Sequence, residues 1–98
     1  MQTTMQRQPQ ETRLVGSDAN DLGIEITHVP ARSGGERLHA YQCGQIIASR
    51  PVDRSDGRPV GGTVSFAADL PADRHSYVRL ALDEGMRVLR DGQSVAAA

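Results

Sequence analysis

Arginine supplies every permanently charged cation of this chain, because the 98 residues include 11 arginines and no lysine. A guanidinium group is a planar fork that binds a carboxylate or a phosphate through two parallel hydrogen bonds. Several arginines and two aspartates fall in or beside two predicted loops, residues 31–35 and 51–62, and we interpret them as a partner-binding set. The members of this set are Arg32, Arg37, Arg54, Arg58, Asp53 and Asp56. The alternative is that they are ordinary solvated loop charges.

The exposed side of a predicted helix carries a second candidate contact. Leu80 lies opposite the predicted buried stripe, and Arg87 follows two turns later with Glu84 between them. An apolar anchor beside an arginine is typical of the centre of a protein interface. We therefore add Leu80 and Arg87 to the candidate partner-binding residues, although a single exposed leucine needs no functional explanation.

Ion pairs are predicted along the same exposed side of the helix. The charged residues Arg79, Asp83, Arg87 and Asp91 alternate in sign at a spacing of four residues. Opposite charges at this spacing are neighbours on a helix and stabilise it by about 0.3–0.5 kcal/mol per pair.

The residue types that perform catalysis or hold metals are present, but not in a known arrangement. Cys43 has no neighbouring signature of an activated thiol and is predicted to be half-buried, and no Gly-x-Ser-x-Gly motif occurs. His28, His39 and Cys43 lack the compact spacing of a zinc site. The glycine pairs match no phosphate-binding motif. We therefore predict a non-enzymatic protein with no catalytic residue, no metal ion and no cofactor.

Alternating apolar and polar residues predict β-strands in the first two thirds of the chain. Ile24, Ile26 and His28 alternate with more polar neighbours until Pro30, as in a half-buried strand. Residues 38–50 are either a hairpin that turns near Gly44 or one bent strand with a bulge there. We favour the hairpin, because strands usually have about five or six residues.

The next segment is interrupted by turn-forming residues. Residues 51–62 are dense in proline, glycine and aspartate, which predicts a long surface loop. Alternation resumes over residues 63–68, which predict the last strand.

A single amphipathic helix is predicted over residues 71–90. One stripe at helical spacing comprises Val78, Ala81, Leu82, Gly85 and Leu89. Because Gly85 has no Cβ, we expect the helix to approach the sheet closely there. Asp91-Gly92 is expected to end the helix. The fold class is therefore α+β, with a three- to four-stranded antiparallel sheet followed by one C-terminal amphipathic helix.

The order of these elements predicts one folded domain between two tails. Residues 1–21 are polar, with few apolar anchors, and are expected to form a flexible N-terminal tail. The alternative is an arm that folds on a partner. Residues 22–92 form the single α+β domain, and residues 93–98 are expected to be a disordered C-terminal tail.

Charge and hydropathy argue against several classes of protein. The formal net charge is −1, so the chain lacks the basic excess of a general nucleic-acid-binding protein. No apolar run approaches the roughly 18 residues of a transmembrane helix, and the N-terminal residues lack the apolar stretch of a secretory signal. We expect a cytoplasmic protein that does not bind membranes.

Three stretches carry a resemblance to a known group of proteins: residues 26–35, 38–41 and 46–50. They resemble small accessory proteins from phages and prophages of GC-rich proteobacteria. Proteins of this group include anti-CRISPR proteins, which act by occupying the surface of a host protein. The resemblance implies a phage-encoded inhibitor of a bacterial defence (CRISPR-Cas) complex in the host cytoplasm.

Two further expectations concern partners and assembly. In the inhibitor, the loop arginines bind acidic groups of the target, while Asp53 and Asp56 meet a nucleic-acid-binding cleft. The alternative function is a small nucleic-acid-binding or regulatory protein that uses the same arginines. We also predict a homodimer, through a sheet face or an edge strand, because one helix covers only one face of the sheet. The alternative is a monomer whose second face is reserved for its target.

Overall fold

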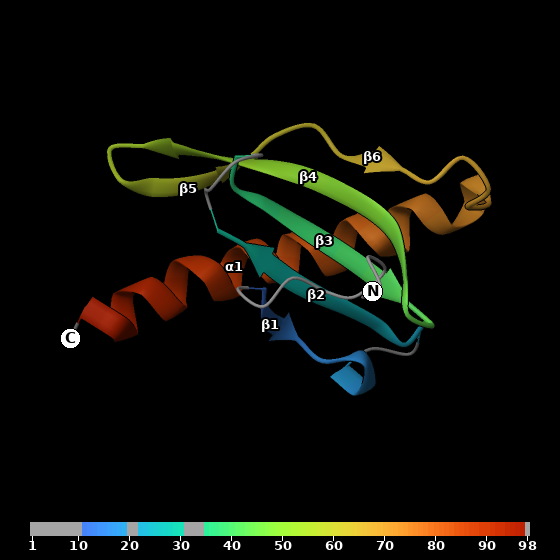
Figure 1. Cartoon of the computed structure of the whole chain (residues 1–98), viewed down its shortest axis with the longest axis horizontal. Helices are drawn as coiled ribbons and strands as arrows, with labels where there is room; N and C mark the ends of the chain where they lie inside the picture. The colour runs from blue at the N-terminus through green and yellow to red at the C-terminus, as the bar shows by residue number, and fades with distance from the viewer. Residues whose placement is uncertain (1–10, 20–21, 31–34, 98) are drawn as a thin grey trace, which may run out of the picture.

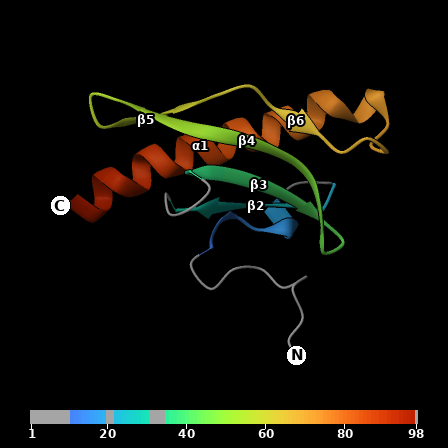
Figure 2. The same cartoon turned by 45° about the horizontal axis from the view of Figure 1, so that its top comes forward.

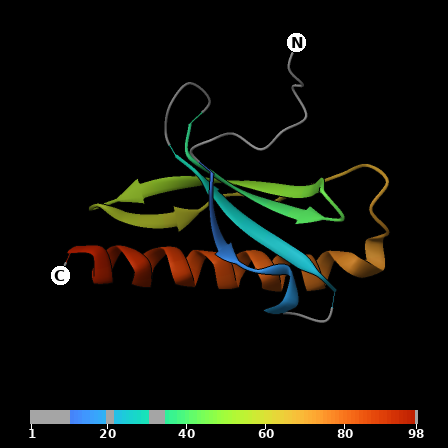
Figure 3. The same cartoon turned by 60° about the horizontal axis from the view of Figure 1, so that its bottom comes forward.

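The computed structural model describes residues 11–19, 22–30 and 35–97, and it confirms the α+β class (Figure 1). A curled antiparallel sheet lies on one side and a single long helix on the other (Figure 3). The strand order is β1-β2-β3-β4-β5, and β6 also pairs with β4. The predicted count of three to four strands is therefore too low. The strands are β1 (Thr12–Val15), β2 (Ile24–Val29), β3 (Arg37–Gln42), β4 (Gln45–Ser55), β5 (Arg58–Gly61) and β6 (Ser65–Phe66).

The hairpin prediction at Gly44 is confirmed. β3 and β4 pair in antiparallel orientation, and Cys43 and Gly44 form the turn between them with φ angles of 53° and 78°. Positive φ at both central residues matches the right-handed twist of the two strands. The predicted half-buried Cys43 is wrong, because this turn leaves its side chain exposed.

The long loop predicted over residues 51–62 is also wrong. β4 continues past its pairing with β3 to Ser55, turns at Asp56-Gly57, and pairs with β5 (Figure 2). Asp56 and Gly57 have φ angles of 53° and 79°. Asp-Gly is a strong signal for a two-residue hairpin turn. The density of glycine and proline obscured this signal.

The tail predicted over residues 1–21 is wrong at Thr12–Val15, which form β1 at one edge of the sheet. β1 pairs with β2, and Val15 is buried in the core. Such a short strand cannot fold alone, so its order depends on β2 and on the helix. Residues 1–10 lie outside the described residues.

The helix begins with the 3₁₀ turn η2 (Ala72–Arg74) and continues as α1 (His75–Ala97). The predicted end at Asp91-Gly92 is wrong, because α1 continues to Ala97. A glycine at an exposed helix position costs about 1 kcal/mol relative to alanine, which is too little to end the helix by itself. Ala98 lies outside the described residues.

The core forms where α1 crosses the concave face of the sheet. The helix contributes Val78, Leu82, Met86 and Leu89, and the strands contribute Val15, Ile24, Ile26, Leu38, Ala40, Ala48 and Val52. A Cβ at Gly85 would lie 2.5 Å from Cγ2 of Ile26. The predicted close approach at Gly85 is therefore confirmed.

An ion pair, a ring stack and a cation–π contact hold the far part of the sheet to the helix. Arg50 of β4 donates a hydrogen bond to Asp83 of α1 at 3.0 Å, and its guanidinium lies over Gly61. Phe66 of β6 stacks on the His75 ring, and Arg79 lies over the Phe66 ring. The last strand is shorter than the predicted residues 63–68, because only Ser65 and Phe66 pair with β4.

Candidate binding surfaces

The β4–β5 hairpin presents two different faces because side chains alternate along each strand. Val52 and Pro59 are buried on the face toward α1. The opposite face carries four exposed side chains, which lie in two cross-strand pairs. We call this set the hairpin face: Asp53 and Val60, Ser55 and Arg58. An acid, a cation, a hydroxyl and an apolar side chain thus share one surface.

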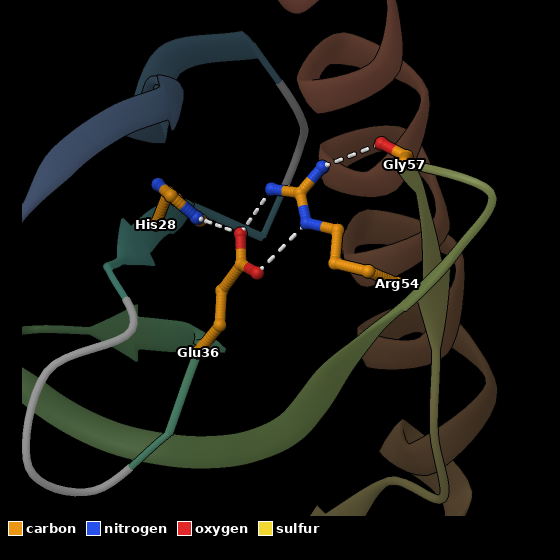
Figure 4. A network of polar contacts seen from close by, with 4 residues as sticks. All are labelled: His28, Glu36, Arg54 and Gly57. Carbon is orange, nitrogen blue, oxygen red and sulfur yellow. Dashed lines mark hydrogen bonds and ion pairs between the residues drawn. The ribbon is translucent and has the colours of Figure 1, made fainter.

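A charged network anchors this hairpin to the neighbouring strands (Figure 4). Glu36, which precedes β3, accepts hydrogen bonds from Nε and Nη2 of Arg54. His28 of β2 lies on the other side of the carboxylate, with its Nε2 atom 2.6 Å from Oε2 of Glu36. Arg54 also donates to the carbonyl of Gly57 in the turn. One carboxylate therefore joins β2, the start of β3 and the hairpin.

The Glu36 carboxyl is held in its charged form although its side chain is only 8% exposed. Burial raises its pKa, but the hydrogen bonds from Arg54 and His28 outweigh this effect and set the pKa below its ordinary value. The backbone adds a further anchor, since the Val52 amide donates to the Glu36 carbonyl at 2.8 Å. The hairpin is consequently a fixed part of the sheet.

Some of the partner-binding residues predicted in the loops form hydrogen bonds or ion pairs with other residues of the chain, and others form no ion pair with the described residues. Arg54 is bound to Glu36, and Nε of Arg37 donates to the Ser49 hydroxyl at 2.8 Å. In contrast, Asp53, Asp56 and Arg58 are exposed and form no ion pair within the described part of the chain. Arg32 lies outside the described residues.

Leu80 was predicted to be exposed on the helix, and in the structure it borders a second surface that the sequence did not reveal. A groove of about 760 Å³ runs between α1 and the first part of the chain. We call it the helix groove; it is lined by Leu14, Val15, Gly16, Leu22, Ile24, Tyr77, Leu80, Ala81, Glu84 and Val88. The Leu80 and Tyr77 side chains are 65% and 57% exposed. The groove lies beside β1, at the opposite edge of the sheet from β5.

The charges on the outside of α1 pair differently from the prediction. Arg87 forms an ion pair with Glu84, three residues before it, while Asp83 pairs with Arg50 of the sheet. Arg79 lies over the Phe66 ring. The predicted pairs at four-residue spacing are therefore replaced by tertiary contacts and one closer helical pair.

The sheet face away from α1 holds a polar cluster. Glu11 accepts hydrogen bonds from the hydroxyls of Thr27 and Tyr41, at 2.8 and 3.0 Å, and its side chain is 2% exposed. Nδ1 of His39 lies 3.8 Å from the same carboxylate. Burial lowers the pKa of His39, with a further lowering by Arg37, and Glu11 only partly opposes this. On this face Tyr41 and Thr27 are buried beneath Glu11, and Cys43 lies in the turn.

The two histidines that were considered as zinc ligands do not share a face of the sheet. His28 pairs with Leu38 and His39 with Thr27, so the two imidazoles project from opposite faces of the sheet. Within residues 11–19, 22–30 and 35–97, no three His, Cys, Asp or Glu side chains gather as metal ligands would. In the same part of the chain, no helix combines the length and hydrophobicity needed to cross a bilayer.

Sequence reasoning missed Glu36, Tyr77 and Val60 as parts of these surfaces. The Asp-Gly turn could have placed Val60 opposite Asp53, had the hairpin been recognised. No local signal marks Glu36, because its partners are 8 and 18 residues away in the sequence. Comparison of the chain with protein-family models, with curated proteins and with solved structures finds no match.

Proposed function

We propose that this chain is a non-enzymatic protein-binding module that contacts its target through the hairpin face. The observation that carries this proposal is that Glu36 anchors the hairpin while Asp53, Asp56 and Arg58 form no ion pair with any other described residue. A preorganised surface binds more tightly, because fewer side chains and backbone torsions must be ordered on contact.

The mixture of charges supports a protein target over a nucleic acid. Nucleic-acid binding requires several free cations, which release the counterions condensed on the phosphates. Near the turn, Arg58 stands beside two carboxylates, Asp53 and Asp56, and Arg54 is bound to Glu36. In the proposed complex, Arg58 binds an acidic group of the target, and the two aspartates bind basic groups. Val60, which is 46% exposed, supplies the apolar part of the contact.

We further propose that the target belongs to a bacterial defence complex and that the chain is a phage-encoded inhibitor of it. The basis is the resemblance of residues 26–35, 38–41 and 46–50 to small phage proteins, among which anti-CRISPR proteins occur. The two aspartates suit a cleft that binds nucleic acid, because such a cleft is lined by basic side chains.

The test is capture of the target together with protection of a phage. Tagged protein is incubated with lysate of a host that carries a defence system, and phage survival is measured in the same host. Arg58→Glu and Val60→Asp should each weaken capture and protection at least about tenfold. Arg74→Glu, an equivalent charge reversal at another exposed site, should leave both unchanged.

Two results would contradict the proposal. The first is the absence of both capture and protection in hosts that carry defence systems. The second is binding of short DNA or RNA that weakens steeply between two salt concentrations, which would instead favour the nucleic-acid-binding alternative.

A further inference from the structure

The helix groove takes no part in the proposed target contact. We propose that the groove binds a second copy of this chain and forms a homodimer with two-fold symmetry. Such a dimer brings the same patch of both copies together, so the patch must be complementary to itself. The groove and its rim meet this requirement in both shape and charge.

The apolar part of the patch contains both projecting and receiving side chains. Leu80 and Tyr77 of α1 project into solvent, with most of their surface exposed. Beside them, Leu14, Leu22 and Ile24 line the recessed side of the groove. When the two α1 helices run antiparallel, Leu80 of each copy enters the groove of the other.

The charged part of the patch identifies the occupant. Among the described residues, Glu84 is the only acidic or basic residue that lines the groove, and its carboxylate pairs with Arg87 of the same helix. Arg87 stands at the rim, 59% exposed, one turn from Glu84. In the antiparallel dimer, Glu84 of each copy faces the partner's Arg87. A second copy therefore supplies the apolar side chains together with a second Glu84–Arg87 pair, so that the four charges alternate in sign across the interface. A net charge of −1 per chain causes little repulsion.

The dimer is independent of the proposed target contact. The groove lies beside β1 and the hairpin face lies on β4 and β5, at opposite edges of the sheet. Association through the groove leaves both hairpin faces exposed. Variants at the hairpin face should lose only target binding, and variants at the groove should lose only dimerisation. The failure of one proposal can thus be distinguished from the failure of the other.

Light scattering after size-exclusion chromatography, over a hundredfold dilution, measures the assembly directly. The expected mass approaches twice 10.6 kDa at high concentration and falls toward 10.6 kDa on dilution. A mass of 10.6 kDa at every concentration would overturn the proposal.

Paired charge reversals test whether the occupant is a second copy in this orientation. Glu84→Arg places two cations on the patch and Arg87→Glu places two acids, so each variant alone should dimerise at least about tenfold more weakly. An equimolar mixture should form a heterodimer, because both cross-contacts then join opposite charges. Circular dichroism of each variant checks that it is folded.

An apolar variant with a matched control completes the test. Leu80→Asp should abolish the dimer, whereas Val60→Asp on the hairpin face should leave it intact. A wild-type dimer that survives Leu80→Asp would place the interface elsewhere and overturn the proposal. Folded charge variants that stay monomeric when mixed would overturn it as well.

Discussion

The hairpin face and the helix groove lie at opposite edges of one sheet, and they differ in how their side chains are held. At the hairpin, one buried carboxylate joins the strands by charged hydrogen bonds to Arg54 and His28. The outer charges there have no ion-pair partner in the part of the chain that the structure describes. At the groove, apolar packing places α1 against β2, and the exposed residues are mainly apolar. Loss of a charge should therefore destabilise the hairpin edge, whereas a change in side-chain volume should destabilise the packing of α1 at the groove edge.

The largest expected effect comes from added volume where α1 meets the sheet. Gly85→Val places side-chain atoms where a Cβ alone would already lie 2.5 Å from Ile26, so we expect a loss of about 3 kcal/mol of unfolding free energy. Gly92→Val has open space around it and should change stability by less than about 0.5 kcal/mol. Urea unfolding measures both. Equal losses in the two variants would show that close approach at Gly85 is not the cause.

Removal of the charge at Glu36 should have the next largest effect. Glu36→Gln keeps the shape but loses the charged hydrogen bonds to Arg54 and His28, which costs about 1–2 kcal/mol. Asp91→Asn, at an exposed site outside both surfaces, should change stability by less than about 0.5 kcal/mol. Hydrogen exchange should accelerate at the amides of residues 52–61 in the first variant. Protection unchanged there would mean that the carboxylate does not anchor the hairpin.

A change in the hairpin turn should cost somewhat less. Gly57 has a φ of 79°, where an L-residue with a Cβ is strained by about 1 kcal/mol. We expect Gly57→Ala to lower stability by about that amount and to weaken target capture, while dimerisation is unchanged. Thermal unfolding and light scattering make the comparison. Loss of the dimer in this variant would contradict the independence of the two edges.

The smallest expected effect is a loss of stability in acid, in two steps. The pKa of His39 is lowered in the folded state, so the stability it contributes is present above its unfolded pKa and is lost as the pH falls through the lower folded value. The Glu36 pKa is also lowered, so its contribution is lost in the same direction at more acidic pH. His39→Gln should remove the first step and Glu36→Gln the second. A variant that leaves its own step in place would refute that assignment.

Local sequence patterns correctly predicted the elements that have their own periodicity or turn signal. The stripe that includes Val78 and Leu82 predicted the helix, and alternation at Ile24 and Ile26 predicted β2. Gly85 was placed correctly, because its position on the buried stripe follows from the helical repeat alone. The same periodicity marked Leu80 as exposed, although it did not indicate a groove.

By itself, the sequence determined the α+β class, the helix with its buried stripe and the turn at Cys43-Gly44, since these depend on residues close together along the chain. Only the tertiary structure decided that Thr12–Val15 form a strand, because four residues gain order solely from β2 and α1. It likewise decided that Arg54 binds Glu36 and that Leu80 borders a groove. The partners in those contacts are far apart in the sequence, so no local spacing specifies them.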